Sequence, residues 1–244
     1  MYPHRIRLQL EAALGHPNAL VGSNVVRIPE NSTHRYTDWA NSLTEEQLYL
    51  DRFKEVTLLM PTWFIKKDDF LASGMFQEQP CEDLLFLYAH VSRGGKLFKV
   101  PEPLTVYRYH EQALTQRKSG FGAIPRKLLL KHRTAAFEKQ VLPGWGRFSI
   151  WSCGRDGKEF FKNTCPETQQ KVVCFADVDP AKVGKDYFHV PLQLRVPIVH
   201  VMEVVPPVII LVASNRDNGF QEKFAQWRAK WPDAQEGVDY WHFC

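Results

Sequence analysis

Two adjacent carboxylates, Glu82 and Asp83, begin an otherwise apolar segment that reads Glu-Asp-Leu-Leu-Phe-Leu-Tyr-Ala-His. Acidic side chains are ordinary in a first helical turn, because unpaired N–H groups and the helix dipole stabilise them by about 0.3–1 kcal/mol. In a cleft, a carboxylate can also take a proton from an alcohol that attacks an electrophile. Successive residues of a helix point about 100° apart, so we expect only one of the two to face a reacting group.

The segments around this pair must position it. A helix is predicted near the start of the chain, with Ile6, Leu10, Ala13 and Leu14 as an apolar stripe. The β-branched run 19–28 predicts a strand, and Thr44 with Gln47 three residues later predicts a capped helix. Residues 56–67 are strand-like but interrupted by a proline, and helices are expected over about 68–74 and after the carboxylate pair.

Composition favours a soluble globular protein that has two modest cores. The chain has 244 residues, of which 44% are hydrophobic and 24% charged. No apolar run approaches the roughly 20 residues that cross a bilayer, so we expect no membrane association. Five cysteines without CxxC spacing favour neither a disulfide framework nor a zinc site, which indicates a reducing, cytoplasmic location. A net charge of +4 permits an anionic partner without requiring one.

The hydrophobic pattern changes in the second half of the chain. Residues 120–145 predict a basic connecting helix, and residues 146–244 alternate strands with helices, which favours a parallel sheet. We therefore expect an α/β protein with three parts: residues 1–119, the connecting helix 120–145, and a small Rossmann-like α/β domain at 146–244.

Four motifs occur in a fixed order within about 60 residues of the first part. They are Gly74 to Phe76, the pair Glu82-Asp83, Gly94-Gly95, and Tyr107-Arg108-Tyr109-His110. This order resembles the second half of the catalytic domain of family 2 glycosyltransferases, which have the GT-A fold. The resemblance implies that residues 1–119 form the C-terminal, acceptor-side part of such a domain.

From about residue 4 onward, the chain is most similar to members of that family that act on tRNA. This resemblance implies a cytoplasmic enzyme that transfers galactose from UDP-galactose to queuosine in tRNA, with a divalent metal, Mn²⁺ or Mg²⁺, in the complete enzyme. In the family, a nucleotide-binding βαβ unit and an Asp-x-Asp motif precede the matched region. We therefore expect this chain to lack the donor-binding half and to be inactive alone.

The resemblance also assigns roles to particular residues. Asp83 is implied to be the general base, with Glu82 beside it, and His110 and Arg108 are implied to lie near the donor diphosphate. An imidazole can bind Mn²⁺ and a guanidinium can pair with phosphate, so His110 is also the candidate metal ligand. Trp63 is a candidate for stacking on the acceptor. The alternatives are a core tryptophan and a strand whose faces simply alternate.

A basic cluster on the connecting helix is a candidate RNA-binding surface, because cations there would meet backbone phosphates. Its members are Arg126, Lys127, Lys131 and Arg133. The alternative is a charged face in contact with solvent only. This cluster supports a second hypothesis, in which the protein is a non-catalytic module that binds tRNA or another protein.

The turn Ser152-Cys153-Gly154-Arg155-Asp156-Gly157 partly matches the glycine fingerprint of dinucleotide sites, with Asp177 at a suitable distance. A third hypothesis is therefore an NAD-dependent enzyme built on residues 146–244. Ser152 replaces the first glycine, and tight turns need glycine whatever the ligand. Asp177-Val178-Asp179 follows the carboxylate pair, whereas the metal motif of the family precedes it, so we do not expect a metal there.

Overall fold

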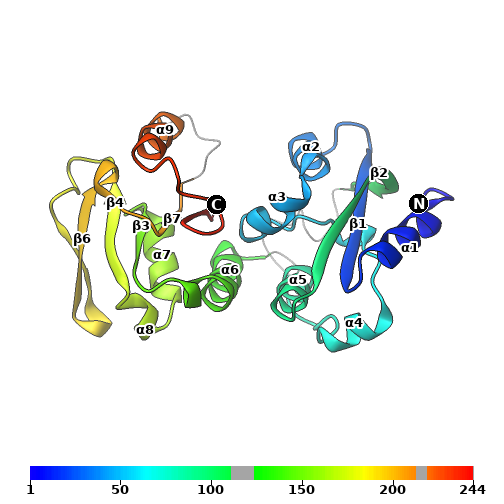
Figure 1. Cartoon of the computed structure of the whole chain (residues 1–244), viewed down its shortest axis with the longest axis horizontal. Helices are drawn as coiled ribbons and strands as arrows, with labels where there is room; N and C mark the ends of the chain where they lie inside the picture. The colour runs from blue at the N-terminus through cyan, green and yellow to red at the C-terminus, as the bar shows by residue number, and fades with distance from the viewer. Residues whose placement is uncertain (111–123, 213–218, 244) are drawn as a thin grey trace. The chain divides into compact units, whose positions relative to one another are not determined.

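The computed structural model describes residues 1–110, 124–212 and 219–243. It divides the chain into two compact units, Met1–Leu129 and Leu130–Cys244. Each unit combines helices with parallel strands (Figure 1), which confirms the predicted α/β class. The predicted boundary between residues 119 and 120 lies outside the described residues.

The first unit is built around a two-stranded parallel sheet. Its elements are α1 (Arg5–Gly15), β1 (Ala19–Ile28), α2 (His34–Ser42), α3 (Glu45–Leu50), η1 (Asp51–Phe53), η2 (Met60–Thr62), α4 (Lys67–Ala72), α5 (Glu82–Ser92) and β2 (Lys96–Arg108). Figure 1 shows α1 on one side of the strand pair and α3 and α5 on the other. The capping box that begins α3 is confirmed, with both of its hydrogen bonds present.

The buried face of α1 is not the predicted apolar stripe. Ile6, Leu10 and Leu14 are exposed by 53%, 47% and 75% of their surface. Gln9 is fully buried instead, and its amide donates to the carbonyl oxygens of Val21 and Thr62 at 3.2 and 2.7 Å. Since a buried amide is stable only when it is hydrogen-bonded, the two bonds from Gln9 fix how α1 sits on the sheet.

The edge of β1 that faces away from β2 is paired by non-strand groups. Val21 exchanges two backbone hydrogen bonds with Phe64. At Val25, the side-chain amide of Asn41 accepts from the N–H and donates to the carbonyl, both at 3.0 Å. The predicted strand over 56–67 was therefore wrong, because Pro61 lies in the 3₁₀ helix η2 and the segment keeps only the bridge at Phe64.

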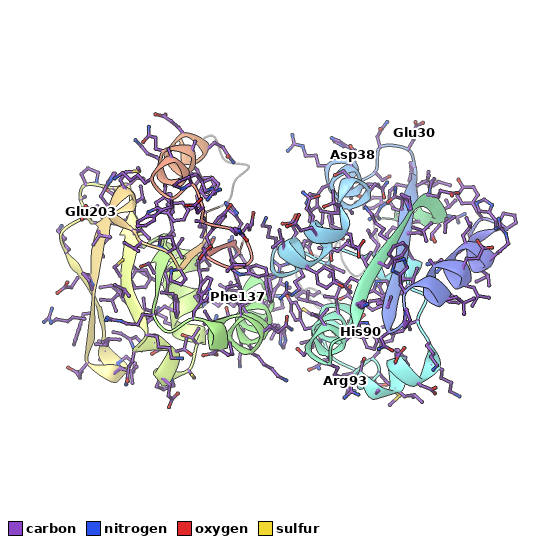
Figure 2. The ribbon with its side chains drawn as sticks, in the orientation of Figure 1. Glu30, Asp38, His90, Arg93, Phe137 and Glu203 are labelled. Carbon is purple, nitrogen blue, oxygen red and sulfur yellow. The ribbon has the colours of Figure 1, made fainter. Side chains whose placement is uncertain are left out.

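His90, on α5, joins three elements of the first unit (Figure 2). Its Nε2 donates to the carbonyl of Lys96 at 3.1 Å, so its Nδ1 accepts from the Ser73 hydroxyl at 3.3 Å. The ring is buried, and burial lowers its pKa. The imidazole therefore acts as a neutral structural link, and Gly95 provides the space that it needs.

The second unit contains a six-stranded sheet in the order β5-β6-β4-β3-β7-β8. Its elements are α6 (Arg126–Gln140), which begins in the first unit, η4 (Leu142–Gly144), β3 (Phe148–Trp151), α7 (Arg155–Asn163), α8 (Pro166–Gln169), β4 (Val172–Asp177), β5 (Asp186–His189), η5 (Val190–Leu192), β6 (Leu194–His200), η6 (Val201–Glu203), β7 (Val208–Ile210), α9 (Phe220–Lys230) and β8 (Tyr240–His242).

Helices cover both faces of this sheet. Trp151 and Ile210 pack against Phe220 and Trp227 of α9 on one face. On the other, Phe137 of α6 (Figure 2) lies within 5.9 Å of the Phe160 ring of α7, measured between centroids. All neighbouring strands are parallel except β5, which runs antiparallel to β6. The order β6-β4-β3-β7-β8 is that of a doubly wound, Rossmann-like sheet.

Replacing Gly95 with alanine tests the role of His90. The new Cβ would lie 2.4 Å from Nε2 of a ring that is held by two hydrogen bonds. We expect Gly95→Ala to lower the free energy of unfolding by about 1–3 kcal/mol, measured by urea denaturation. Gly15→Ala is the control, since nothing lies within 4 Å of its Cβ position. Equal stability of the two variants would contradict the packing described here.

Candidate functional site

Asp83 lies half-buried in the first turn of α5. Its Oδ1 accepts a hydrogen bond from the backbone N–H of Leu84 at 2.7 Å. Within the described part of the chain, no cation forms an ion pair with it. Burial raises the pKa of Asp83, and the negative charges of Glu82 and Glu55 raise it further. The hydrogen bond from Leu84 lowers the pKa but does not cancel the rise. The result is a carboxylate with a stronger affinity for a proton than an exposed aspartate.

Tyr36 on α2 is influenced by the charge of Asp83. The Tyr36 hydroxyl donates to the carbonyl of Val56 at 3.1 Å. Burial raises the pKa of Tyr36, the charges of Glu55 and Asp83 raise it further, and the charge of Arg27 lowers it. The positive charge of Arg27 on β1 and the negative charges of Glu55 and Asp83 therefore all act on Tyr36.

We call Tyr36 and the four residues whose charges act on it the Tyr36 cluster: Arg27, Tyr36, Glu55, Asp83 and Tyr107. Arg27 is the cation of this cluster. The Arg27 guanidinium carbon lies 4.0 Å from the centroid of the Tyr107 ring, its partner across the parallel strands. Sequence reasoning overlooked Arg27 and Tyr36, and it named Tyr107 only as part of the Tyr107-Arg108-Tyr109-His110 motif. The signal that was available is the alternation at the end of β1, where half-buried Arg27 stands between exposed Val26 and Ile28.

Glu82 faces different surroundings from Asp83, as the helical geometry predicts. It lines a cavity of about 230 Å³ between the end of α4 and one face of α5, and Asp83 is not among the lining residues. The lining residues are Ser73, Gly74, Met75, Gln77, Glu82, Leu85, Phe86 and Ala89. An almost wholly apolar cavity with one carboxylate suits a compact group that has an apolar face and a hydrogen-bond donor.

Trp63 belongs to an aromatic cluster beside this cavity. Its ring lies 5.5 Å from that of Phe86, a cavity-lining residue, and 6.0 Å from that of Phe76, between centroids. Its Nε1 donates to the carbonyl of Leu58 at 2.9 Å. The side chain is half-buried, so it is anchored in the core and also has an exposed part. The acceptor-stacking role of Trp63 stays a prediction.

Arg108 and His110 do not share the face of the Tyr36 cluster. Arg108 pairs with Ile28 in the register, one position beyond the Arg27–Tyr107 pair, and successive strand residues point to opposite faces. Both Arg108 and His110 are exposed. Their predicted positions near a donor diphosphate stay predictions, and Arg27 is the strand arginine whose charge acts on Tyr36.

The residues that the structure describes do not include three or more His, Cys, Asp or Glu side chains grouped so as to hold a metal ion. His110 therefore belongs to no such group within this part of the chain, and the described residues alone do not fit the divalent-metal site that the family resemblance implies. We derive no step through a metal.

The basic residues of α6 do not form one stripe. At about 100° per residue, Arg126 and Arg133 lie on one side of the helix and Lys127 and Lys131 on another, with buried Thr134 and Phe137 between them. Arg126, Lys127 and Lys131 are exposed, whereas Arg133 is half-buried. Three of the four predicted RNA-binding residues are therefore accessible on α6.

In the second unit, Asp177 ties two loops together. Its Oδ2 accepts from the backbone N–H of Cys153 at 3.2 Å and from Lys182 Nζ at 2.9 Å, and its Oδ1 accepts from the N–H of Asp179 at 3.0 Å. Burial alone would raise the pKa of Asp177, but these bonds, that of Lys182 foremost, hold it below the usual range. The carboxylate that would bind a ribose in a dinucleotide site is therefore occupied by protein groups.

No model of a known protein family matches this chain, and no solved structure matches it at a significant level. Among the helices that the structure describes, none has the length and apolar character needed to cross a membrane.

The pKa shift of Asp83 gives a prediction about stability. Because the folded state holds the proton more tightly than the unfolded chain, stability falls as pH rises from about 4 through the raised pKa. We expect Asp83→Asn, which carries no charge, to raise the free energy of unfolding at pH 7, as measured by urea denaturation. Asp38→Asn, an exposed position on α2 (Figure 2), should leave it unchanged. A destabilised Asp83→Asn would mean that the carboxylate is structural.

Proposed function

We propose that this protein is an inverting glycosyltransferase of the family 2 type, which transfers galactose from UDP-galactose to queuosine in tRNA. The observation that carries the proposal is the state of Asp83: half-buried, without an ion-pair partner in the described part of the chain, and with a raised pKa. A general base works best when its pKa lies near the working pH. The order of motifs around the carboxylate pair supports the choice of family.

In the proposed reaction, Asp83 takes the proton from an acceptor hydroxyl as the oxygen attacks the anomeric carbon. The bond from that carbon to the diphosphate oxygen breaks, UDP leaves with its electron pair, and the configuration at the carbon inverts. The structural basis is that Glu82 and Asp83 diverge, so one carboxylate acts as base while the other lines a neighbouring cavity. The cavity and the Trp63 cluster are suited to the apolar part of an acceptor.

Substitution of the base tests this proposal. General-base assistance is worth about 10²- to 10⁴-fold in rate, so Asp83→Asn should lower kcat for galactosyl transfer from UDP-galactose to tRNA by that factor. The assay is run on the chain alone and on a chain extended at its N-terminus by a donor-binding βαβ segment with an Asp-x-Asp motif. The extended chain should give the larger rate.

Two variants serve as comparisons for this assay. Asp38→Asn removes an exposed carboxylate from the same unit and should leave the rate unchanged. Asp83→Glu keeps a carboxylate and should retain part of the activity. Wild-type turnover in the Asp83→Asn protein would refute the assignment of the base, and no transfer by either wild-type form would refute the transferase.

A second candidate function is non-catalytic binding of tRNA, which the exposed Arg126, Lys127 and Lys131 favour. Each phosphate contact adds about 0.7–0.9 to the slope of log K against log salt concentration. Replacing all three residues with glutamine should lower that slope by about two to three in an electrophoretic shift assay with tRNA.

Charge removal elsewhere provides the control for the salt experiment. Lys66, Lys67 and Arg93 are exposed cations of the first unit, and their combined replacement with glutamine removes the same net charge. An equal change in slope from both triple variants would show that α6 makes no particular contact with RNA. Binding that survives Asp83→Asn, in a protein without transferase activity, would favour the binding module.

A further inference from the structure

We propose that Arg27 binds a phosphate group of the substrate nucleotide. This inference rests on the proposed function, since it names a residue of the same site. The family 2 resemblance gave Arg27 no role.

The strand register fixes the position of Arg27. β1 and β2 run parallel, and Arg27 pairs with Tyr107 while Val25 pairs with Thr105. Since alternate residues of a strand share a face, Arg27, Val25, Thr105 and Tyr107 lie on one face of the sheet. The guanidinium carbon lies over the Tyr107 ring, 4.0 Å from its centroid, so this contact holds the group in place before any ligand arrives.

Two buried polar atoms on this face have no hydrogen-bond partner among the described residues. They are Nε of Arg27 and Oγ1 of Thr105, and Thr105 as a whole is only 6% exposed. A buried donor without an acceptor costs about 1–3 kcal/mol. The described part of the chain also places no carboxylate in an ion pair with Arg27. An anionic ligand that meets the exposed part of the half-buried Arg27 side chain would supply a strong acceptor for the guanidinium.

The chemistry of the guanidinium defines which ligand would fit. The charge of Arg27 and those of Asp83 and Glu55 all act on Tyr36, so the cation and the carboxylates influence the same tyrosine. Guanidinium groups bind phosphate by two parallel hydrogen bonds, and both proposed substrates carry phosphate: the UDP-sugar in its diphosphate and the tRNA in its backbone.

Binding by the full-length chain tests the inference. Calorimetric titrations use three probes, pyrophosphate, UDP and an anticodon stem-loop RNA, on the wild type, Arg27→Gln, Arg27→Lys and Arg93→Gln. Arg93 is exposed at the far end of α5 from Asp83 (Figure 2) and controls for the loss of one positive charge. Circular dichroism establishes that each variant is folded. If Arg27→Gln is not folded, the comparison of Arg27→Lys with the wild type tests the inference, because lysine keeps the positive charge but lacks the planar guanidinium.

We expect Arg27→Gln to weaken the binding of at least one probe by about 10- to 100-fold, Arg27→Lys to weaken it less, and Arg93→Gln to leave it unchanged. Weakening for pyrophosphate and UDP alone assigns the donor diphosphate, and weakening for RNA alone assigns the acceptor backbone. Three results would overturn the inference: equal affinities of wild type and Arg27→Gln, an equal loss in Arg93→Gln, or no binding of any probe by the wild type.

The outcomes separate this inference from the proposed function. Phosphate binding that depends on Arg27, in a protein that shows no galactosyl transfer, would leave the inference standing and refute the transferase. Galactosyl transfer with unchanged substrate affinities in Arg27→Gln would refute the inference and leave the transferase. Asp83→Asn should retain phosphate binding in either case, because no hydrogen bond or ion pair joins Asp83 to Arg27 among the described residues.

Discussion

The first unit holds a carboxylate partly out of water, and within the described part of the chain no cation forms an ion pair with it. Desolvation of a charge is costly, and a structural carboxylate normally recovers that cost through an ion pair, as Asp177 does with Lys182 in the second unit. Asp83 accepts from backbone N–H groups at the start of α5, where the helix dipole also favours its charge, and burial still raises its pKa. The two aspartates therefore differ in their affinity for a proton: ion pairing lowers the pKa of Asp177, and burial raises that of Asp83.

Parallel pairing of β1 with β2 decides which side chains accompany Asp83. Arg27 and Tyr107 are partners, and Ile28 and Arg108 are the next pair. A slip of one residue in β2 would exchange its two faces and bring the exposed Arg108 to the place of Tyr107, opposite Arg27. The register therefore determines the chemistry of the site, and it depends on contacts distant from that site, such as the bond from Gln9 to Val21.

Local signals in the sequence were sufficient for much of the fold. The α3 capping box, the alternation of strands and helices in the second unit and the end of α5 before Gly94 follow from local chemistry. Contacts between residues distant in sequence could not be predicted from these local patterns. The amide of Gln9 rather than the apolar stripe faces the sheet, and Arg27 joins the site through pairing with a residue 80 positions away. The functional roles of Asp83 and Glu82 remain predictions.

The amide of Asn41 has a consequence for how the protein behaves at high concentration. By exchanging two hydrogen bonds with Val25, it reproduces the pattern of a neighbouring peptide group, and Phe64 does the same at Val21. A strand edge closed in this way does not offer a template to another chain. An apolar side chain at position 41 would leave the backbone N–H and carbonyl of Val25 without these hydrogen bonds, and intermolecular β-pairing would begin there.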